Sequence, residues 1–123
     1  MFVLSKNVIQ GTIPQWIGTS WRNLSTFAVD GNMMEGLLPS SLMTMTNLRH
    51  VELQLNSKLS GRFDEVMEAI PGLEYFDFSN TDLGGTIPTQ EMPSLRVFKG
   101  WNTEKLSGTI PIDIGRNWKN LGV

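Results

Sequence analysis

The sequence contains no cysteine, one histidine and one tyrosine among its 123 residues. Without cysteine there can be no disulfide and no thiolate metal ligand, although this absence does not fix the cellular compartment. The single histidine has no second histidine or cysteine with which to build a transition-metal site. No kinase, hydrolase or phosphate-loop signature is present. We therefore expect no catalytic residue, no metal and no cofactor.

Net charge and long apolar runs are also scarce. The net charge of −2 at pH 7 gives no indication of a nucleic-acid or anionic-membrane partner. Apolar runs reach only a few residues, so no segment is expected to span a membrane. The apolar start, residues 1–4, is followed by Ser5 and Lys6 and is too short for the core of a signal peptide. A glycosylation sequon at Asn23 gives weak support for secretion and does not establish that Asn23 is modified.

The sequence does contain a recurring motif: an apolar residue, one residue, glycine, one residue, an apolar residue and, in most copies, proline. The spacings between the motif glycines are 25, 25, 24 and 23 residues, counted from the sequence as Gly11, Gly36, Gly61, Gly85 and Gly108. A repeat of this length indicates a solenoid in which each unit is one coil, since one unit cannot bury its apolar face alone.

Each repeat has the same internal order. Alternating apolar residues upstream of the glycine, as in Val51 and Leu53, predict a short strand with one buried face. An asparagine such as Asn56 follows and is expected to turn inward and bond backbone groups. The arc after the glycine should be helical or 3₁₀, and residues 64–70 are the best helix candidate because their acidic start precedes good helix formers.

The repeated motif resembles the plant-type leucine-rich repeat, LxxLxLxxNxLxGxIPxxLxxL, over essentially the whole chain. The resemblance implies an α/β solenoid: a right-handed coil with a concave parallel sheet, short second strands and 3₁₀ or helical outer arcs. It also suggests the ectodomain arrays of receptor-like kinases and receptor-like proteins. We expect one domain, residues 1–123, of about five coils, to be a fragment of a longer array that lacks both caps.

Several positions depart from the family pattern. Gly100 stands where a strand leucine is expected, and Thr81 replaces the asparagine of the fourth coil. An extra residue before Leu59 and before Leu106 predicts a small bulge. On the outer arcs, Trp16, Trp21 and Trp118 are expected to be in the core or to cover it. If the caps are absent, the exposed residues would be Phe2 and Leu4 at one end and Ile114, Trp118 and Leu121 at the other, so end-to-end association is a possible consequence.

Stacked coils place equivalent outward positions about 4.8 Å apart, in rows on the concave face. One row holds Thr26, His50, Tyr75 and Val97; the next holds Val3, Ala28, Glu52, Asp77 and Lys99; the third holds Ser5, Asp30, Gln54, Ser79 and Trp101. These polar and aromatic positions are typical of a recognition surface. The predicted partner-binding residues are His50, Glu52, Gln54, Tyr75, Asp77, Ser79, Lys99 and Trp101.

The favoured function is a non-catalytic scaffold that recognises a protein or peptide through the concave face. One alternative is a structural spacer of a larger receptor. Another is a solenoid that binds ice or carbohydrate, because the position after each motif glycine reads Thr12, Leu37, Arg62, Thr86 and Thr109. An enzyme built on His50, Glu52 and Asp77 would need an enclosing loop that the even repeat spacing does not supply. Family resemblance favours an extracellular or cell-surface location, with an intracellular one not excluded.

Overall fold

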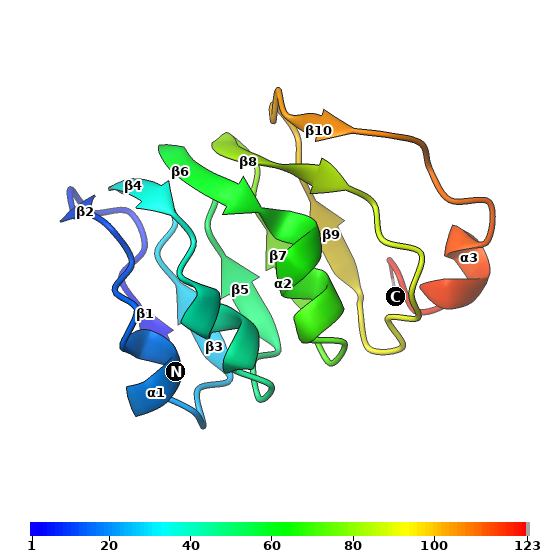
Figure 1. Cartoon of the computed structure of the whole chain (residues 1–123), viewed down its shortest axis with the longest axis horizontal. Coiled ribbons are helices and arrows are strands. Elements are labelled where there is room, and N and C mark those ends of the chain that lie inside the picture. The colour runs from blue at the N-terminus through cyan, green and yellow to red at the C-terminus, as the bar shows by residue number, and fades with distance from the viewer. Residues whose placement is uncertain (123) are drawn as a thin grey trace.

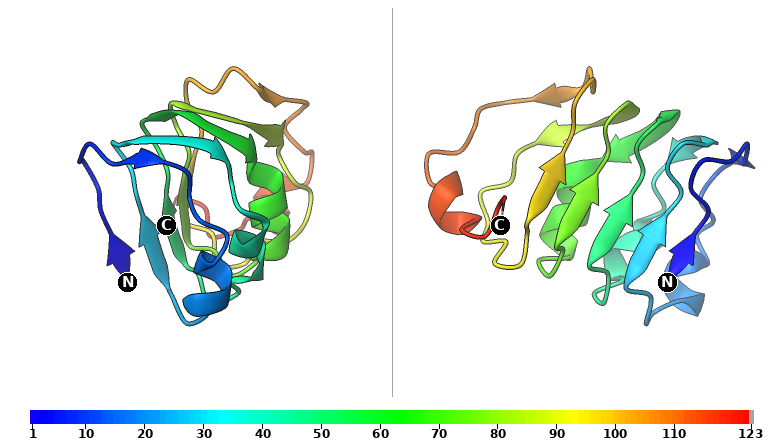
Figure 2. Two further views of the ribbon diagram at one scale, coloured as in Figure 1. Left: turned by 60° about the vertical axis from the view of Figure 1, so that its left-hand side comes forward. Right: turned by 180° about the vertical axis from the view of Figure 1, so that it is seen from behind.

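A computed structural model describes residues 1–122 as a stack of five coils. Two five-stranded parallel sheets run along the stack (Figure 1). The five strands of the concave sheet lie side by side in chain order (Figure 2, right), and they are β1 (Phe2–Val3), β3 (Thr26–Ala28), β5 (His50–Glu52), β7 (Tyr75–Asp77) and β9 (Val97–Lys99). The second sheet contains β2 (Gln10–Gly11), β4 (Met33–Leu37), β6 (Asn56–Arg62), β8 (Thr81–Thr86) and β10 (Leu106–Ser107). The predicted right-handed leucine-rich repeat solenoid is thereby confirmed.

Short helices form the outer arcs, opposite the concave sheet (Figure 1). They are α1 (Ile17–Ser20), the 3₁₀ helix η1 (Ser40–Thr44), α2 (Phe63–Ala69) and α3 (Ile114–Asn117). The sequence prediction of a helix over residues 64–70 is confirmed by α2, which is shifted by one residue and carries Asp64 and Glu65 in its first turn. Carboxylates there interact favourably with the positive end of the helix dipole.

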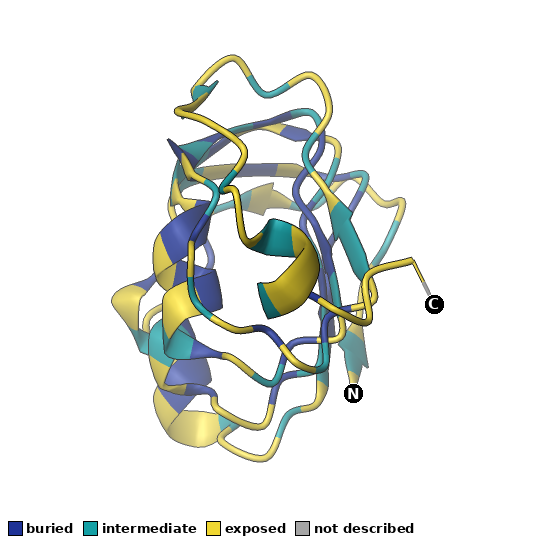
Figure 3. Cartoon of the chain, turned by 90° about the vertical axis from the view of Figure 1, so that its right-hand side faces the viewer, coloured by how far each residue is buried: buried dark blue, intermediate teal, exposed yellow. Residues whose placement is uncertain are grey.

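The apolar core fills the space between the two sheets and the outer arcs, and it is tightest in the third and fourth coils. Val51, Phe63 and Phe78 are completely buried. The last coil is more open, since Ile112 is 99% exposed and α3 turns much of its surface to solvent (Figure 3). Each inner coil is covered by neighbours on both sides, as expected of a one-dimensional stack.

Trp118 is buried in the core, which agrees with its predicted core or covering role and not with the expected exposure at the C-terminal end. It is only 2% exposed, because its ring packs edge-on against Phe98 with centroids 5.2 Å apart. Its indole N–H donates to the carbonyl of Gln90 at 3.1 Å. The chain folds back after α3, and Trp118 thus covers the core of the fourth and fifth coils, while Leu121 is exposed as predicted.

Two buried asparagines join neighbouring coils. The Asn56 amide donates to the carbonyls of Leu53 and Val29, at 2.9 and 3.0 Å, and its oxygen accepts from the Met34 N–H at 2.9 Å. Asn32 accepts in the same way from the N–H of Ile9 in the first coil. These bonds satisfy backbone groups freed as the chain leaves the concave strand, as the sequence predicted.

The two residues that depart from the family pattern, Thr81 and Gly100, have separate explanations. Thr81 bonds within its own coil, donating to the Phe78 carbonyl at 2.6 Å, so it replaces only part of the asparagine role. A Cβ on Gly100 would lie 2.3 Å from Cζ of Phe78, so the large Phe78 ring requires glycine there. The predicted bulge in the third coil is confirmed by a register shift between Asn56 and Ser60.

The turn after each concave strand has one residue in the left-handed region. The five residues are Lys6, Gly31, Leu55, Asn80 and Asn102. Leu55, with φ of 61°, is poorly suited to this region, as Lys6 is, because neither a missing Cβ nor a short polar side chain relieves the crowding. It is also 49% exposed, so packing does little to offset the strain.

Candidate recognition surface

The eight residues predicted to bind a partner lie on or just after β5, β7 and β9, and we call them the concave strip. Strand register pairs His50 with Tyr75, and Glu52 with Asp77, which in turn pairs with Lys99. Backbone bonds beyond the strands continue the third row, since Leu55 N–H donates to the Ser79 carbonyl and Asn80 N–H to that of Trp101. The rows predicted from the sequence are therefore present.

One half of the concave strip is organised around Glu52. His50 Nε2 lies 2.7 Å from one carboxylate oxygen, and the Gln54 amide donates to the other at 3.0 Å. Burial raises the pKa of Glu52, but the hydrogen bonds with Gln54 and His50 and the Coulomb interactions with His50 and Lys99 outweigh it, and the pKa is lowered overall. Glu52 is consequently a fixed negative charge on this face.

The other half is organised around Tyr75. Its ring stacks on His50, with centroids 4.2 Å apart and planes within 8° of parallel. Lys99 Nζ lies 3.3 Å from the Tyr75 hydroxyl and 4.0 Å from Oδ2 of Asp77. The hydrogen bond with Tyr75, aided by Coulomb attraction, raises the pKa of Lys99. Stacking and hydrogen bonding together hold Tyr75 in one orientation.

The members of the concave strip differ in exposure. Trp101 is 60% exposed, whereas Asp77 and Ser79 are buried, contrary to the expectation of a strip of outward, solvated side chains. Asp77 is covered because it turns back to accept from the Ser79 N–H at 3.0 Å. A partner could thus contact the side chains of Trp101, Tyr75 and Lys99 directly, and also Glu52 with its bonded neighbours. Asp77 and Ser79 are buried beneath these side chains and could only support them.

The enzyme alternative finds little support in this geometry. His50 is hydrogen-bonded to Glu52, but the Asp77 carboxylate instead accepts from the Ser79 N–H and pairs with Lys99. Among residues 1–122, no group of three or more histidine, cysteine, aspartate or glutamate side chains is placed to hold a metal ion.

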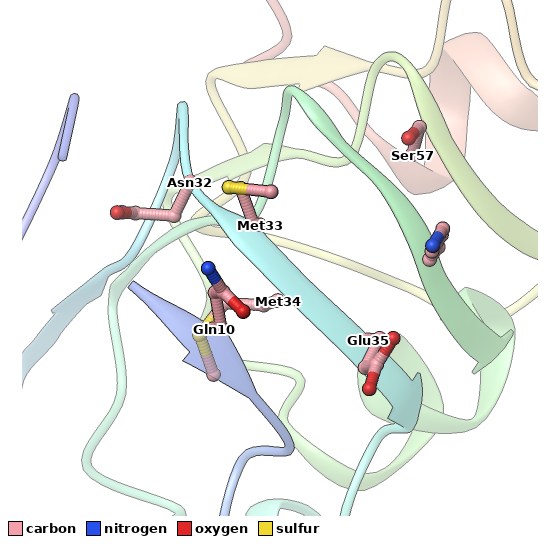
Figure 4. A pocket seen from close by; sticks show the side chains of 7 residues that line it. Gln10, Asn32, Met33, Met34, Glu35 and Ser57 are labelled. Carbon is pink, nitrogen blue, oxygen red and sulfur yellow. The ribbon is translucent and has the colours of Figure 1, made fainter. Parts of the chain in front are cut away.

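Several hollows lie away from the concave strip. One of about 180 Å³ is lined by residues of the second sheet, with Gln10, Met33 and Glu35 around it (Figure 4). The second, about 190 Å³, is an apolar recess among Phe2, Trp21 and their neighbours in the first coil. The third, about 450 Å³, is more open and is lined by Met1 and residues 19–24. The first two are smaller than the several hundred cubic ångströms typical of small-molecule pockets. The concave strip remains the candidate site because its side chains are held by mutual stacking and hydrogen bonds.

The ice-binding alternative requires a flat row of threonines, and the second sheet does not provide one. Register pairs Leu37 with Ser60 and Thr86 with Ser107, so positions equivalent in the repeat are displaced by two residues from one coil to the next. The expected row from Thr12 to Thr109 is therefore not a column of direct neighbours.

No family model and no curated protein sequence matches the chain. Solved structures do. The leucine-rich repeat ectodomain of the receptor kinase SOBIR1 from Arabidopsis thaliana superposes with a TM-score of 0.79 at 27% identity, over 89% of this chain. The chain resembles plant leucine-rich repeat receptor ectodomains. Pollen Receptor Kinase 3 matches with a TM-score of 0.73 at 27% identity, also over 89% of the chain.

The plant peptide hormone receptor RGFR1, in complex with RGF2, matches with a TM-score of 0.72 at 25% identity over 98% of the chain. The chain spans 59% of the SOBIR1 chain, 52% of the Pollen Receptor Kinase 3 chain and 23% of the RGFR1 chain. The matched SOBIR1 structure is a leucine-rich repeat ectodomain, and this likeness supports the prediction that the chain is not an enzyme. In residues 1–122 no helix has the length and apolarity needed to cross a membrane.

Proposed function

We propose that this chain is a recognition scaffold that binds a protein or peptide ligand through the concave strip. The observation that carries the proposal is the arrangement of His50, Glu52, Tyr75 and Lys99. Their side chains come from three adjacent coils and are fixed by stacking and hydrogen bonds before any ligand arrives. Preorganisation of this kind lowers the entropy cost of binding.

Trp101 supplies an anchor beside this group. Large, half-exposed aromatic side chains contribute a disproportionate share of binding energy at protein interfaces. The likeness to RGFR1, solved in complex with RGF2, is consistent with a peptide as ligand. The same likeness to receptor ectodomains supports an extracellular or cell-surface location and five coils that act within a longer array.

The alternative of a structural spacer differs in one testable respect. A spacer needs no selective surface, so substitutions on the concave strip would affect neither binding nor folding. A recognition scaffold requires that Trp101→Ala and Tyr75→Ala weaken binding by about tenfold or more while stability changes little.

The test uses the purified chain as bait for a phage-displayed library of random linear peptides. Selected peptides are resynthesised, and their affinities for the wild type, Trp101→Ala and Tyr75→Ala are measured by titration calorimetry. Trp16→Ala serves as the matched control, because Trp16 is a half-exposed tryptophan on the outer arc. Unfolding of every variant is followed by circular dichroism.

Loss of affinity in both concave variants, with Trp16→Ala unchanged, would support the proposal. It would be contradicted by a library that yields no specific binder, or by binders that lose affinity only through Trp16→Ala. Parallel losses of stability and affinity in Tyr75→Ala and Trp101→Ala would equally count against it.

A further inference from the structure

Three aspartate carboxylates are buried in this protein, and they differ in their partners. Asp64 accepts from the N–H groups of Glu65 and Thr86, each at 3.1 Å, and it pairs with Arg62. Asp77 has the Ser79 N–H and the nearby ammonium group of Lys99, as described above. Two of the three buried carboxylates thus have donors supplied by the chain.

Asp30 is the exception. It is 4% exposed, and within residues 1–122 its Oδ1 is buried without a hydrogen-bond partner. None of the ion pairs formed by these residues includes Asp30. A buried acceptor without a donor lowers the stability of the folded protein, and a charged one lowers it more.

Asp30 belongs to the concave face. Phe27 and Val29 are in the core cluster, and Ala28 pairs with Glu52 of β5, so alternation directs Asp30 to the same side as Glu52. The ladder continues beyond the strands, with the Gly31 N–H donating to the Gln54 carbonyl at 2.8 Å. Gln54 is therefore the neighbour of Asp30 in the next coil.

Gln54 presents a second unpartnered acceptor. Its amide N–H₂ is directed to Glu52, and its Oε1 is buried without a partner within the described residues. Two adjacent coils thus offer acceptor oxygens, a carboxylate from Asp30 and an amide from Gln54, beside the charged Glu52. Only a donor can satisfy this combination, and a positively charged donor satisfies it best.

The number of oxygen partners that a cation needs decides which cation this site can bind. Calcium takes six to eight oxygen ligands, which two side chains cannot supply. Guanidinium and ammonium groups need fewer partners, and the planar guanidinium fork can donate to two oxygens at once. The site therefore suits a basic side chain.

We propose that Asp30 and Gln54 form a subsite for a basic side chain, arginine or lysine, of the ligand that binds the concave strip. This rests on the proposed recognition of a protein or peptide. Because both acceptor oxygens are covered, Gln54 must rotate to admit the ligand, and its 3.0 Å bond to Glu52 breaks in doing so. The unmatched Asp30 lowers the stability of the free protein, and the ligand supplies the missing donor.

The experiment compares Asp30→Asn with the wild type, using the peptides selected from the random library. Each peptide is made again with citrulline for arginine and norleucine for lysine, which remove the charge at similar length. Asp82→Asn is the matched control, since Asp82 is paired with Lys105 on the second sheet. Affinities and unfolding midpoints are measured for all three proteins.

We expect selected peptides to contain a basic residue whose neutral replacement reduces affinity about tenfold or more. In Asp30→Asn this difference between charged and neutral peptides should largely vanish, whereas Asp82→Asn should retain it. The unfolding midpoint of Asp30→Asn should be unchanged or higher, because the new amide can donate to Gln54 Oε1 and no charge is buried.

A lowered midpoint accompanied by a uniform loss of affinity for charged and neutral peptides would overturn the inference, since it would assign Asp30 a structural role. Binders without basic residues, still sensitive to Trp101→Ala, would also overturn it while leaving the recognition function intact. Failure to select any binder would refute the recognition function itself.

Discussion

The two sheets of this solenoid stack the same repeats in different ways. In the concave sheet equivalent residues are direct neighbours, so that Phe27 faces Val51 and Val51 faces Phe76. In the second sheet the register is displaced by two residues, and Gly36 faces Leu59 rather than Gly61. Only the concave sheet therefore builds continuous side-chain columns.

Because of this difference in register, the concave sheet is suited to recognising a ligand and the second sheet to holding the coils together. Columns of direct neighbours let side chains of several coils act on one ligand, as His50 and Tyr75 of one column and Glu52 and Lys99 of the next can. The staggered sheet instead contributes glycine turns, a bulge in β6 and contacts to the outer arcs. Substitutions should consequently affect stability in the core and second sheet, and binding on the concave face.

The largest expected effect is in the core beneath the concave sheet. Phe78→Ala should lower the free energy of unfolding by about 3–5 kcal/mol, because a fully buried ring stacked 4.4 Å from Phe63 would leave a cavity. Urea denaturation measures the loss. Ile112→Ala, at a nearly fully exposed position in the last coil, is the control and should change stability by less than about 0.5 kcal/mol. Equal losses would show that the last coil packs as tightly as the centre.

The next effect concerns the bonds between coils. Asn56→Ala removes two donated bonds and one accepted bond and leaves buried backbone groups unpaired, so we expect a loss of about 2–3 kcal/mol. Asn7→Ala is the control, because Asn7 is exposed and bonds only within its own coil. If chemical denaturation gives the two variants equal stability, the buried asparagines do not stabilise the contacts between coils.

The staggered sheet itself can be tested at Gly36. Its φ is 78°, and an added Cβ would lie 2.9 Å from Cγ2 of Thr12, so Gly36→Ala should cost about 1–2 kcal/mol. Gly115→Ala is the matched control, since Gly115 lies in α3 with open space around it and should be neutral or slightly stabilising. A Gly36→Ala variant as stable as the wild type would contradict the described register.

A smaller, opposite effect is expected in the turns that link the sheets. Leu55→Asn should stabilise the protein by about 0.5–1 kcal/mol, because asparagine tolerates the left-handed region and already occupies it at positions 80 and 102. Thermal unfolding should show a higher midpoint. A lower midpoint would mean that Leu55 makes contacts that outweigh its backbone strain.

The smallest effect concerns pH. Because the folded state lowers the pKa of Glu52, its contribution to stability is present above the ordinary glutamate pKa and is lost as the pH falls through the folded value. Glu52→Gln should therefore flatten the decline of stability between about pH 6 and about pH 3. Denaturant titrations across this range measure the slope, and an unchanged slope would show that Glu52 gains nothing on folding.

The concave columns, the helix at residues 64–70 and the inward asparagines could all be predicted from the sequence, because each follows from a local sequence pattern. The two-residue displacement of the second sheet could not, since no pattern within one repeat specifies how neighbouring coils align. Burial of Trp118 agrees with its predicted place in the core or covering it. Burial of Asp77 was missed because it depends on a contact with Ser79 that a repeat pattern does not specify. The unpartnered Asp30 is visible only once its neighbours are placed.

The asparagine bonds described above give the stack a polarity. Asn32 serves the backbone of the first coil, and Asn56 serves that of the second, so each of these coils is completed by the one that follows it. Removing a coil from the C-terminal side of such a pair would take away the asparagine that bonds the preceding coil, whereas removing one from the N-terminal side would leave that asparagine in place; the backbone bonds between the paired strands are lost in both cases. Lengthening and shortening of the array are therefore not equivalent at its two ends.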